Sequence, residues 1–159
     1  DRSSAASDVY KRQDQVRAVL AAGMQPILCV GESLKERQQG VALDFAVGQV
    51  HDVTRDLDAK QAKRLIIAYE PVWAIGTGMV ATANSAQEAA LAIREDLRVT
   101  FGDDVADTVR ILYGGSVTSS NASSLIAEPD VDGFLVGGAS LDAEELSNIV
   151  RLTAAQSRL

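Results

Sequence analysis

The sequence predicts an α/β protein whose central sheet is built from parallel strands. Short, continuous apolar runs alternate with longer segments whose apolar residues recur at helical spacing, and this alternation repeats along the 159 residues. Strands separated by a helix cannot form hairpins, so they pair in parallel through right-handed crossovers. Each apolar run is followed by a loop that contains glycine, as expected where the chain turns at a strand end.

The first dozen residues, DRSSAASDVYKR, show neither helical nor strand periodicity. We interpret residues 1–13 as a non-native leader and residues 14–159 as the folded unit. The helical pattern begins near Asp14 with QVRAVLAAG and stops at Gly23. The run PILCV, at 26–30, is of the kind that a strand buried on both faces shows.

The remaining elements repeat this order. Ser85, with Glu88 three residues later, predicts a capping box at the start of one of the helices. The other predicted elements are a helix at 42–57 and a strand at 65–69, a helix at 86–97 and a strand at 109–113, a helix at 121–128 and a strand at 133–136, and a last helix at 142–152.

Composition narrows the classes of function. The formal net charge is -7, from 15 basic and 22 acidic residues without a basic cluster, which argues against nucleic acid or an anionic membrane as a partner. No apolar run approaches the roughly 20 residues that span a bilayer. The single cysteine, Cys29, excludes an internal disulfide framework, so we expect a reducing, cytoplasmic setting. Because Cys29 lies inside the predicted strand at 26–30, we expect a buried, inert thiol.

Two of the loops contain paired glycines, GGS at 114–116 and GGAS at 137–140. In a parallel sheet they lie at the carboxyl edge of the strands, where α/β proteins bind ligands. Glycine lets backbone amides approach a ligand and cradle an anion such as phosphate, and Ser116 adds a hydroxyl donor. Paired glycines also serve simply to turn the chain, and the pattern leaves both interpretations open.

Glu70 stands directly between a predicted strand and Pro71. A residue before proline is biased toward extended backbone, so Pro71 would hold this carboxylate at the strand tip. The apolar Val72, Trp73 and Ile75 can remove water from it when the loop folds over, and a desolvated carboxylate is a stronger base. A solvated glutamate at a strand end is the competing interpretation. The residue types favour neither the desolvated base nor the solvated glutamate.

Four motifs in this order closely resemble the triosephosphate isomerase family: ILCVGE at 27–32, AYEPVWAIGTG at 68–78, ILYGGSV at 111–117 and FLVGGASL at 134–141. The resemblance covers the chain from about Asp14 to the C-terminal region. A (β/α)8 barrel takes about 250 residues. The resemblance therefore implies a partial TIM barrel, strands 5 to 8 with their helices, in residues 14–159, with the N-terminal half of the barrel missing.

The resemblance also implies an activity. Members of the family interconvert dihydroxyacetone phosphate and D-glyceraldehyde 3-phosphate by proton transfer through an enediol, in glycolysis and gluconeogenesis. The expected partner is the small triose phosphate, the full-length enzyme is expected to be a cytoplasmic homodimer, and neither a cofactor nor a metal is expected.

Roles follow residue by residue from the resemblance. Glu70 matches the catalytic base, and Glu32 matches a partner of Trp73 when the lid at 71–81 is closed. The substrate phosphate is expected at Gly76, Ser116, Gly137 and Gly138. The lid and its latch are expected at Pro71, Val72, Trp73, Thr77, Gly78, Glu32 and Tyr113, with Ser116 also contributing to the latch.

Two electrophiles of the family are not found in the sequence. The family uses a lysine from an Asn-x-Lys segment and a neutral histidine to polarise the substrate carbonyl. The only histidine, His51, lies in the predicted helix at 42–57, where a surface or packing role is favoured. We therefore expect the chain alone to be inactive. Because a half sheet leaves unpaired edges and an uncovered face, we also expect poor stability, self-association or aggregation.

Two other functions stay open. A catalytically silent half-barrel would bind phosphate through Ser116, Gly137 and Gly138, or pair with a complementary half, without turnover. A different phosphate-binding barrel enzyme, such as an aldose-ketose isomerase of amino-acid biosynthesis, would share the glycine loops. The uninterrupted AYEPVWAIGTG motif argues against that enzyme class, because the motif is not part of its pattern.

Overall fold

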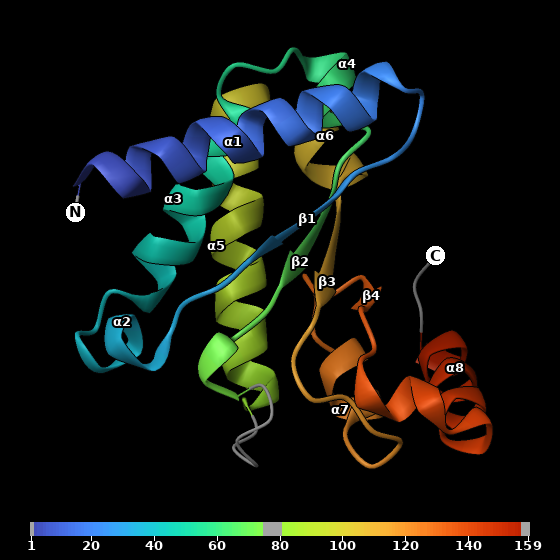
Figure 1. Cartoon of the computed structure of the whole chain (residues 1–159). Coiled ribbons are helices and arrows are strands. Elements are labelled where there is room, and N and C mark those ends of the chain that lie inside the picture. The colour runs from blue at the N-terminus through green and yellow to red at the C-terminus, as the bar shows by residue number, and fades with distance from the viewer. Residues whose placement is uncertain (1, 75–80, 157–159) are drawn as a thin grey trace.

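The computed structural model describes residues 2–74 and 81–156 (Figure 1). One parallel sheet, in the order β1-β2-β3-β4, contains the strands β1 (Ile27–Val30), β2 (Ile66–Tyr69), β3 (Arg110–Tyr113) and β4 (Gly133–Phe134). The α-helices are α1 (Arg2–Ala21), α2 (Leu34–Gln38), α3 (Ala42–Thr54), α4 (Ala59–Ala62), α5 (Ala83–Phe101), α6 (Asp103–Thr108), α7 (Ala122–Ile126) and α8 (Ala143–Gln156). Two short 3-10 helices are η1 (Val72–Ala74) and η2 (Gly138–Leu141).

The strands pair in parallel throughout the described sheet, as the sequence predicted. Each predicted apolar run contains one strand. At the carboxyl ends, Val30 pairs with Tyr69, Tyr69 with Tyr113, and Tyr113 with Phe134. The loops that follow these four residues therefore leave the sheet at one edge.

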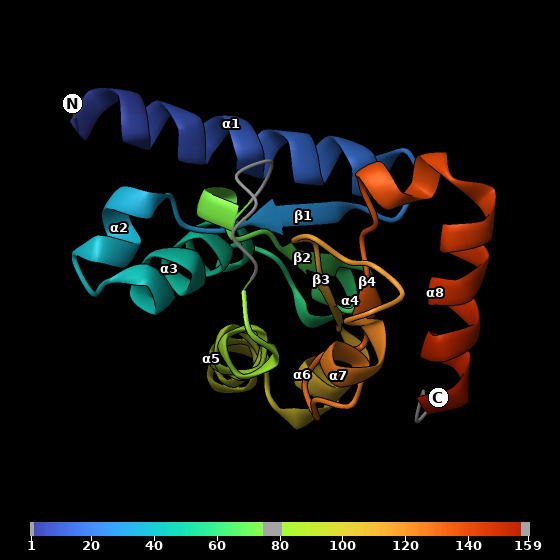
Figure 2. The same cartoon turned by 90° about the horizontal axis from the view of Figure 1, so that it is seen from below.

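One face of the sheet packs against helices and forms the core. Figure 2 shows α3, α5 and α7 along this side, with α1 beside β1 and α8 beside β4. Ile67 and Ile111 from the strands meet Val50 of α3 and Ile93 and Leu97 of α5, and all five side chains are fully buried. Among the described residues, none of the helices is both long enough and apolar enough to cross a membrane.

The opposite face of β1 is exposed, which corrects the prediction of a strand buried on both sides. Leu28 and Val30 point into the core, whereas Ile27 is 47% exposed and Cys29 is exposed. The predicted burial of Cys29 is therefore wrong. Successive side chains of a strand point to opposite faces, and the helical layer described above covers the Leu28 side. The exposed side agrees with the expectation that four strands leave one sheet face uncovered.

Helix α1 begins at Arg2, so the prediction that helical structure starts near Asp14 is wrong. The segment from 2 to 21 contains neither glycine nor proline, and a helix anchored at its C-terminal part can extend through it. Gln13, Val16 and Leu20 are buried on one side of α1. The interpretation of residues 1–13 as a non-native leader stays a prediction.

Helix α5 begins at Ala83 with Thr82 as its N-cap, so the capping box predicted at Ser85 and Glu88 is wrong. Oγ1 of Thr82 accepts a hydrogen bond from the amide of Ser85 at 3.1 Å. Ser85 is therefore the third residue of the helix. Threonine and serine are both favoured caps, so residue type could not distinguish between these two positions.

We expect Thr82→Ala to lower the free energy of unfolding by about 1 kcal/mol, because the amide of Ser85 loses its side-chain acceptor. Ser85→Ala is the matched control and should cost less, since the Ser85 hydroxyl hydrogen-bonds to the Thr82 hydroxyl, at 3.0 Å, and not to a backbone amide of the described residues. Urea denaturation followed by circular dichroism measures both variants. Equal losses would contradict the assignment of the cap to Thr82.

A buried ion-pair cluster ties α5 to the segment before β4. Arg94 is 8% exposed, and its guanidinium lies 2.8 Å from the carboxylate of Asp130 and 2.7 Å from that of Asp132. It also donates to the carbonyl of Ala106 at 2.7 Å. Asp132 accepts a second bond, from the amide of Ile111 in β3, at 2.7 Å. The cluster therefore fixes β3 and the entry to β4 against α5.

Candidate active site

Glu70 follows β2 directly, at the carboxyl edge of the sheet. Its amide donates to the carbonyl of Val30 at 2.7 Å, which continues the pairing of β1 with β2 one residue beyond the strand. The chain then turns through a buried Pro71 into η1. The structure thus places Glu70 at a strand tip, the position that the sequence predicted, with its side chain partly exposed.

Two glycines make room for Glu70. A Cβ atom at Gly31 would lie 1.6 Å from the carbonyl oxygen of Glu70, and one at Gly114 would lie 2.6 Å from its Cγ. Gly31 comes directly after β1 and Gly114 directly after β3, so the tips of both neighbouring strands enclose the glutamate. The amide of Gly114 donates to the carbonyl of Tyr69 at 2.8 Å.

Sequence reasoning missed this contact between the glycines and Glu70. It treated Gly114 as part of a loop pair and gave Gly31 no role. One feature of the sequence could have predicted the contact: each glycine is the first residue after a strand, and these two strands flank the strand of Glu70 in a parallel sheet. Adjacent strand tips lie about 4.8 Å apart, which leaves no space for a side chain against a neighbouring backbone that bends inward.

The thiol of Cys29 lies beside the Glu70 carboxylate. Although Cys29 is exposed, partial burial of the sulfur raises the pKa of its thiol, and the negative charge and hydrogen bond of Glu70 raise it further, while Arg12 acts in the opposite direction. A thiol that keeps its proton is a poor nucleophile. The predicted inertness of Cys29 is consistent with this environment.

Glu32 is a fully buried carboxylate that follows Gly31. Its Oε1 accepts hydrogen bonds from Nε1 of Trp73 at 2.9 Å and from Oη of Tyr69 at 3.0 Å. The guanidinium of Arg37 lies 3.4 Å from the same oxygen and stacks over the indole ring at 4.2 Å. The structure therefore brings Glu32 and Trp73 together, a contact that the family resemblance implied for the closed lid, and adds Tyr69 and Arg37 as partners of Glu32. A function of this contact in lid closure stays a prediction.

We expect the free energy of unfolding to fall as the pH rises above about 10, the ordinary pKa of tyrosine. Burial raises the pKa of Tyr69, and the adjacent Glu32 raises it further. Burial also raises the pKa of Tyr113. The unfolded chain then releases tyrosine protons that the folded protein retains, and each such proton lowers stability by about 1.4 kcal/mol per pH unit until the folded pKa is reached.

Two variants test this pH dependence. Tyr69→Phe should make the loss of stability above pH 10 less steep, whereas Tyr10→Phe, which alters a ring 61% exposed on α1, should leave it unchanged. Urea titrations at a series of alkaline pH values measure the slope for each protein. A slope that is the same in Tyr69→Phe and in the parent would show that this tyrosine does not carry the effect.

The two paired-glycine loops leave the same edge of the sheet as Glu70. Ser116 is exposed after β3, and Gly137 and Gly138 are exposed after β4. A Cβ at Gly115 would lie 2.2 Å from Oη of Tyr113, so packing requires that glycine. By contrast, a Cβ at Gly137 or Gly138 would meet no described atom within 4 Å, and neither residue has a positive φ. The folded backbone gives no steric reason for glycine at these two positions.

The other predicted site residues are distributed as follows. Tyr113 is buried, and its hydroxyl has no hydrogen-bond partner among the described residues. Val72 is 50% exposed at the start of η1. Gly76, Thr77 and Gly78 lie outside the described residues. His51 is exposed on α3 and lies 3.2 Å from Asp96, which agrees with the predicted surface role.

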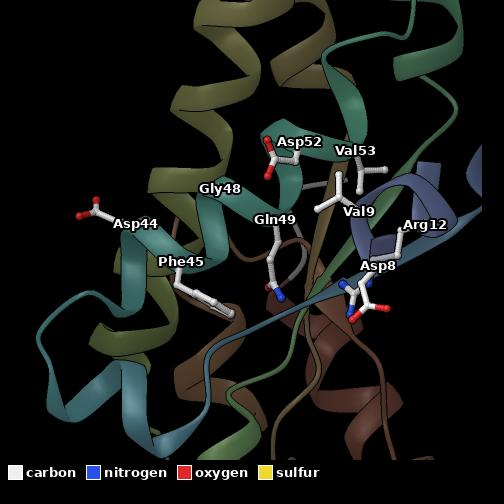
Figure 3. A pocket seen from close by; sticks show the side chains of 9 residues that line it. All are labelled: Asp8, Val9, Arg12, Asp44, Phe45, Gly48, Gln49, Asp52 and Val53. Carbon is white, nitrogen blue, oxygen red and sulfur yellow. The ribbon is translucent and has the colours of Figure 1, made fainter. Parts of the chain in front are cut away.

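A pocket of about 400 Å³ lies apart from these residues, between α1 and α3 (Figure 3). It is lined by Asp8, Val9, Arg12, Asp44, Phe45, Gly48, Gln49, Asp52 and Val53. None of the predicted site residues lines it. Three of the lining residues belong to the segment 1–13, so we assign it no function.

Together, the parallel sheet, the carboxylate at a strand tip and the glycine loops on the same edge place this chain among the α/β proteins, a class that binds ligands at the carboxyl ends of its strands. A family model described as triosephosphate isomerase matches residues 2–153. The chain belongs to the triosephosphate isomerase family.

Curated relatives agree with this assignment. The chain is 76% identical over 139 residues to a triosephosphate isomerase of Bifidobacterium longum (strain DJO10A), a match that covers 87% of this chain and 52% of the relative. It is 72% identical over 140 residues to that of Bifidobacterium adolescentis, covering 88% and 53%, and 50% identical over 140 residues to that of Saccharopolyspora erythraea, covering 88% and 54%. The chain thus spans about half the length of the curated relatives it matches.

Proposed function

We propose that this chain supplies the catalytic base and the phosphate-binding loops of a triosephosphate isomerase, an intramolecular aldose-ketose isomerase of glycolysis and gluconeogenesis. In this proposal, β1 to β4 correspond to strands 5 to 8 of a (β/α)8 barrel. The observation that carries it is the position of Glu70, held at the tip of β2 between Gly31 and Gly114, on the sheet edge from which both paired-glycine loops leave.

Glu70 would transfer the proton. Its carboxylate would take a proton from the carbon next to the carbonyl of dihydroxyacetone phosphate and return it to the neighbouring carbon, through an enediol. Backbone contacts with Gly31 fix the main chain of Glu70, and Gly114 limits the space that its side chain can occupy. This confinement favours a defined carboxylate position, which proton transfer requires within hydrogen-bond reach.

The phosphate of the substrate would lie against Ser116, Gly137 and Gly138, with Gly76 of the lid. Supporting this, the folded backbone does not itself require glycine at 137 or 138, whereas a ligand that approaches the main chain closely does. The lid at 71–81 would exclude water, which protects an enediol phosphate from losing its phosphate. Trp73 would anchor the beginning of the lid through its bond to Glu32.

Turnover would require groups that these residues do not include. A lysine and a neutral histidine from a complementary polypeptide would polarise the substrate carbonyl, and the chain alone would be inactive. The whole enzyme would be a homodimer of the cytoplasm, as the family resemblance implies.

Complementation tests the proposal. The purified chain should show no isomerase activity by itself and should gain it when mixed with a polypeptide that carries the first half of a relative's barrel. Glu70→Gln should remove the restored activity while leaving the association of the two polypeptides unchanged. Glu144→Gln, the same chemical change at an exposed position on α8, serves as the matched active control. Restored activity that survives Glu70→Gln would show that Glu70 is not the base.

A silent phosphate-binding unit is the second candidate, favoured by the exposed and sterically unrequired Gly137 and Gly138. Inorganic phosphate should then shift the amide resonances of these two glycines in the isolated chain, while the amide of Gly48 on α3 stays unchanged. Such shifts, together with complementation in which both halves fold and associate without turnover, would favour this candidate. Unshifted glycine amides would remove the phosphate cradle.

A further inference from the structure

The loop between β3 and α7 is fastened to the first turn of α8 by one side chain. Both carboxylate oxygens of Glu145 take part: Oε1 accepts a hydrogen bond from the amide of Ser119 at 2.6 Å, and Oε2 accepts one from its hydroxyl at 2.9 Å. The helices that follow the two loops, α7 and α8, pack against each other (Figure 1). Hydrogen bonds to a charged acceptor are stronger than neutral ones, and two of them together fix orientation as well as distance.

The Ser119 end of this contact belongs to the loop that carries Ser116. Nδ2 of Asn121 donates to the carbonyl of Ser116 at 2.9 Å, and Oδ1 of Asn121 accepts a hydrogen bond from the amide of Thr118 at 2.8 Å. The amide of Asn121 donates in turn to the carbonyl of Thr118 at 3.2 Å. The segment 116–121 is therefore closed on itself by its own asparagine. A restraint on Ser119 consequently restrains Ser116 as well.

The Glu145 end belongs to the loop that carries Gly137 and Gly138. Gly138 is the first residue of η2, and the amide of Ser140 in this turn donates to the carbonyl of Gly137 at 2.9 Å. Asp142 follows η2, and its carboxylate accepts a hydrogen bond from the amide of Glu145 at 3.0 Å, as the side chain of an N-cap does. Glu145 is thus joined to the paired glycines through one short, hydrogen-bonded turn.

We propose that Glu145 is a positioning residue for the substrate phosphate, which holds the Ser116 loop and the loop of Gly137 and Gly138 in a fixed relative position. This inference rests on the proposed function, in which both loops bind the same phosphate group. A ligand contacted from two loops is bound tightly when both loops are already in place, because ordering a loop on binding reduces the net affinity. Both oxygens of Glu145 are engaged by Ser119, so Glu145 acts through the loops and not by contacting the ligand.

Glu145→Ala removes the contact and tests the proposal in the isomerase restored by mixing the chain with the first half of a relative's barrel. The Michaelis constant, KM, for dihydroxyacetone phosphate should rise about tenfold, the equivalent of one lost hydrogen bond to a charged group, because the substrate must then order the loops itself. The change in kcat should be smaller, since a phosphate contact shared by the bound substrate and the transition state appears mainly in KM. Partial unfolding would instead lower kcat and leave KM unchanged.

Two further variants separate the positioning role from charge and from general effects on α8. Glu145→Gln should keep the KM of the parent, since Oε1 of glutamine can accept from the Ser119 amide while its Nε2 donates to the Ser119 hydroxyl oxygen. Glu144→Ala makes the same truncation at the exposed neighbouring position and should leave KM unchanged. Circular dichroism establishes that every variant is folded.

Inorganic phosphate provides a second test on the chain by itself. Titrated against the amide resonances of Ser116, Gly137 and Gly138, it should bind Glu145→Ala about tenfold more weakly than the parent. Equal KM and equal phosphate affinity in Glu145→Ala and the parent would overturn the proposal, as would a raised KM that Glu145→Gln shares. Phosphate that shifts none of these amides in the parent would overturn it together with the phosphate cradle. A parent mixture without turnover would count against the isomerase alone, because the phosphate titration still decides the role of Glu145.

Discussion

Arg94→Met is expected to lower the free energy of unfolding by about 3–5 kcal/mol. The guanidinium is the common partner of Asp130 and Asp132 and of the carbonyl of Ala106, and its side chain is 9% exposed. Methionine keeps the apolar stem and removes the charge, so two partly buried carboxylates lose their cation. Since small domains are stable by only about 5–15 kcal/mol, a large fraction of the stability would be lost.

Arg98→Met is the matched control on the same helix. Arg98 contacts the carboxylates of Asp103 and Asp107 and pairs with Glu95, but all three partners are more than half exposed. Its substitution should shift the urea midpoint only slightly, because exposed ion pairs contribute little. Urea denaturation of the parent and both variants measures the difference. Similar urea midpoints for Arg94→Met and Arg98→Met would show that the buried ion pairs of Arg94 contribute no more to the free energy of unfolding than the exposed ones of Arg98.

Gly31→Ala is expected to be the most damaging small substitution at the site. The new methyl group would lie 1.6 Å from the carbonyl oxygen of Glu70, and both atoms are fixed by the backbone, so no side-chain rotation relieves the overlap. The tips of β1 and β2 must separate, which breaks the 2.7 Å bond from the Glu70 amide to Val30. We expect a loss of about 3 kcal/mol or more, the upper part of the range for overpacked positions.

Two further glycine variants serve as comparisons for the stability of Gly31→Ala. Gly48→Ala, in the middle of α3, meets nothing within 4 Å and should stabilise the protein by about 0.5–1 kcal/mol. Gly114→Ala approaches the side chain of Glu70 rather than its backbone, at 2.6 Å from Cγ, so it should cost less stability than Gly31→Ala. In the complemented enzyme it should still reduce turnover, because it displaces the carboxylate. A stable Gly31→Ala variant would contradict the packing described here.

The strands could be predicted because each is a short apolar run that ends at a glycine or at Glu70. Length and continuity suffice to identify such runs, and alternation with helices makes them parallel. The same reasoning predicted the position of Glu70, since Pro71 restricts its backbone. The chemical roles of Glu70 and of the glycine loops rest on the family resemblance, because residue types alone left them open.

The missed features depend on contacts between distant segments. Arg37 and Tyr69 join Glu32 only after β1, β2 and α2 have packed, and no local spacing indicates that meeting. The exposure of Cys29 depends on what covers a whole sheet face. The sequence of an apolar strand does not indicate whether its second face is covered or open. Thr82 could not be preferred over Ser85 because both are good caps.

The contact between Trp73 and Glu32 gives the protein an intrinsic optical probe. Trp73 is the single tryptophan of the chain, so fluorescence excited selectively in tryptophan arises from one ring. That ring donates to a buried carboxylate and lies under the guanidinium of Arg37, three residues beyond Glu70. Its emission therefore reports the surroundings of the β2 tip directly, and binding at that edge can be followed in the unlabelled protein.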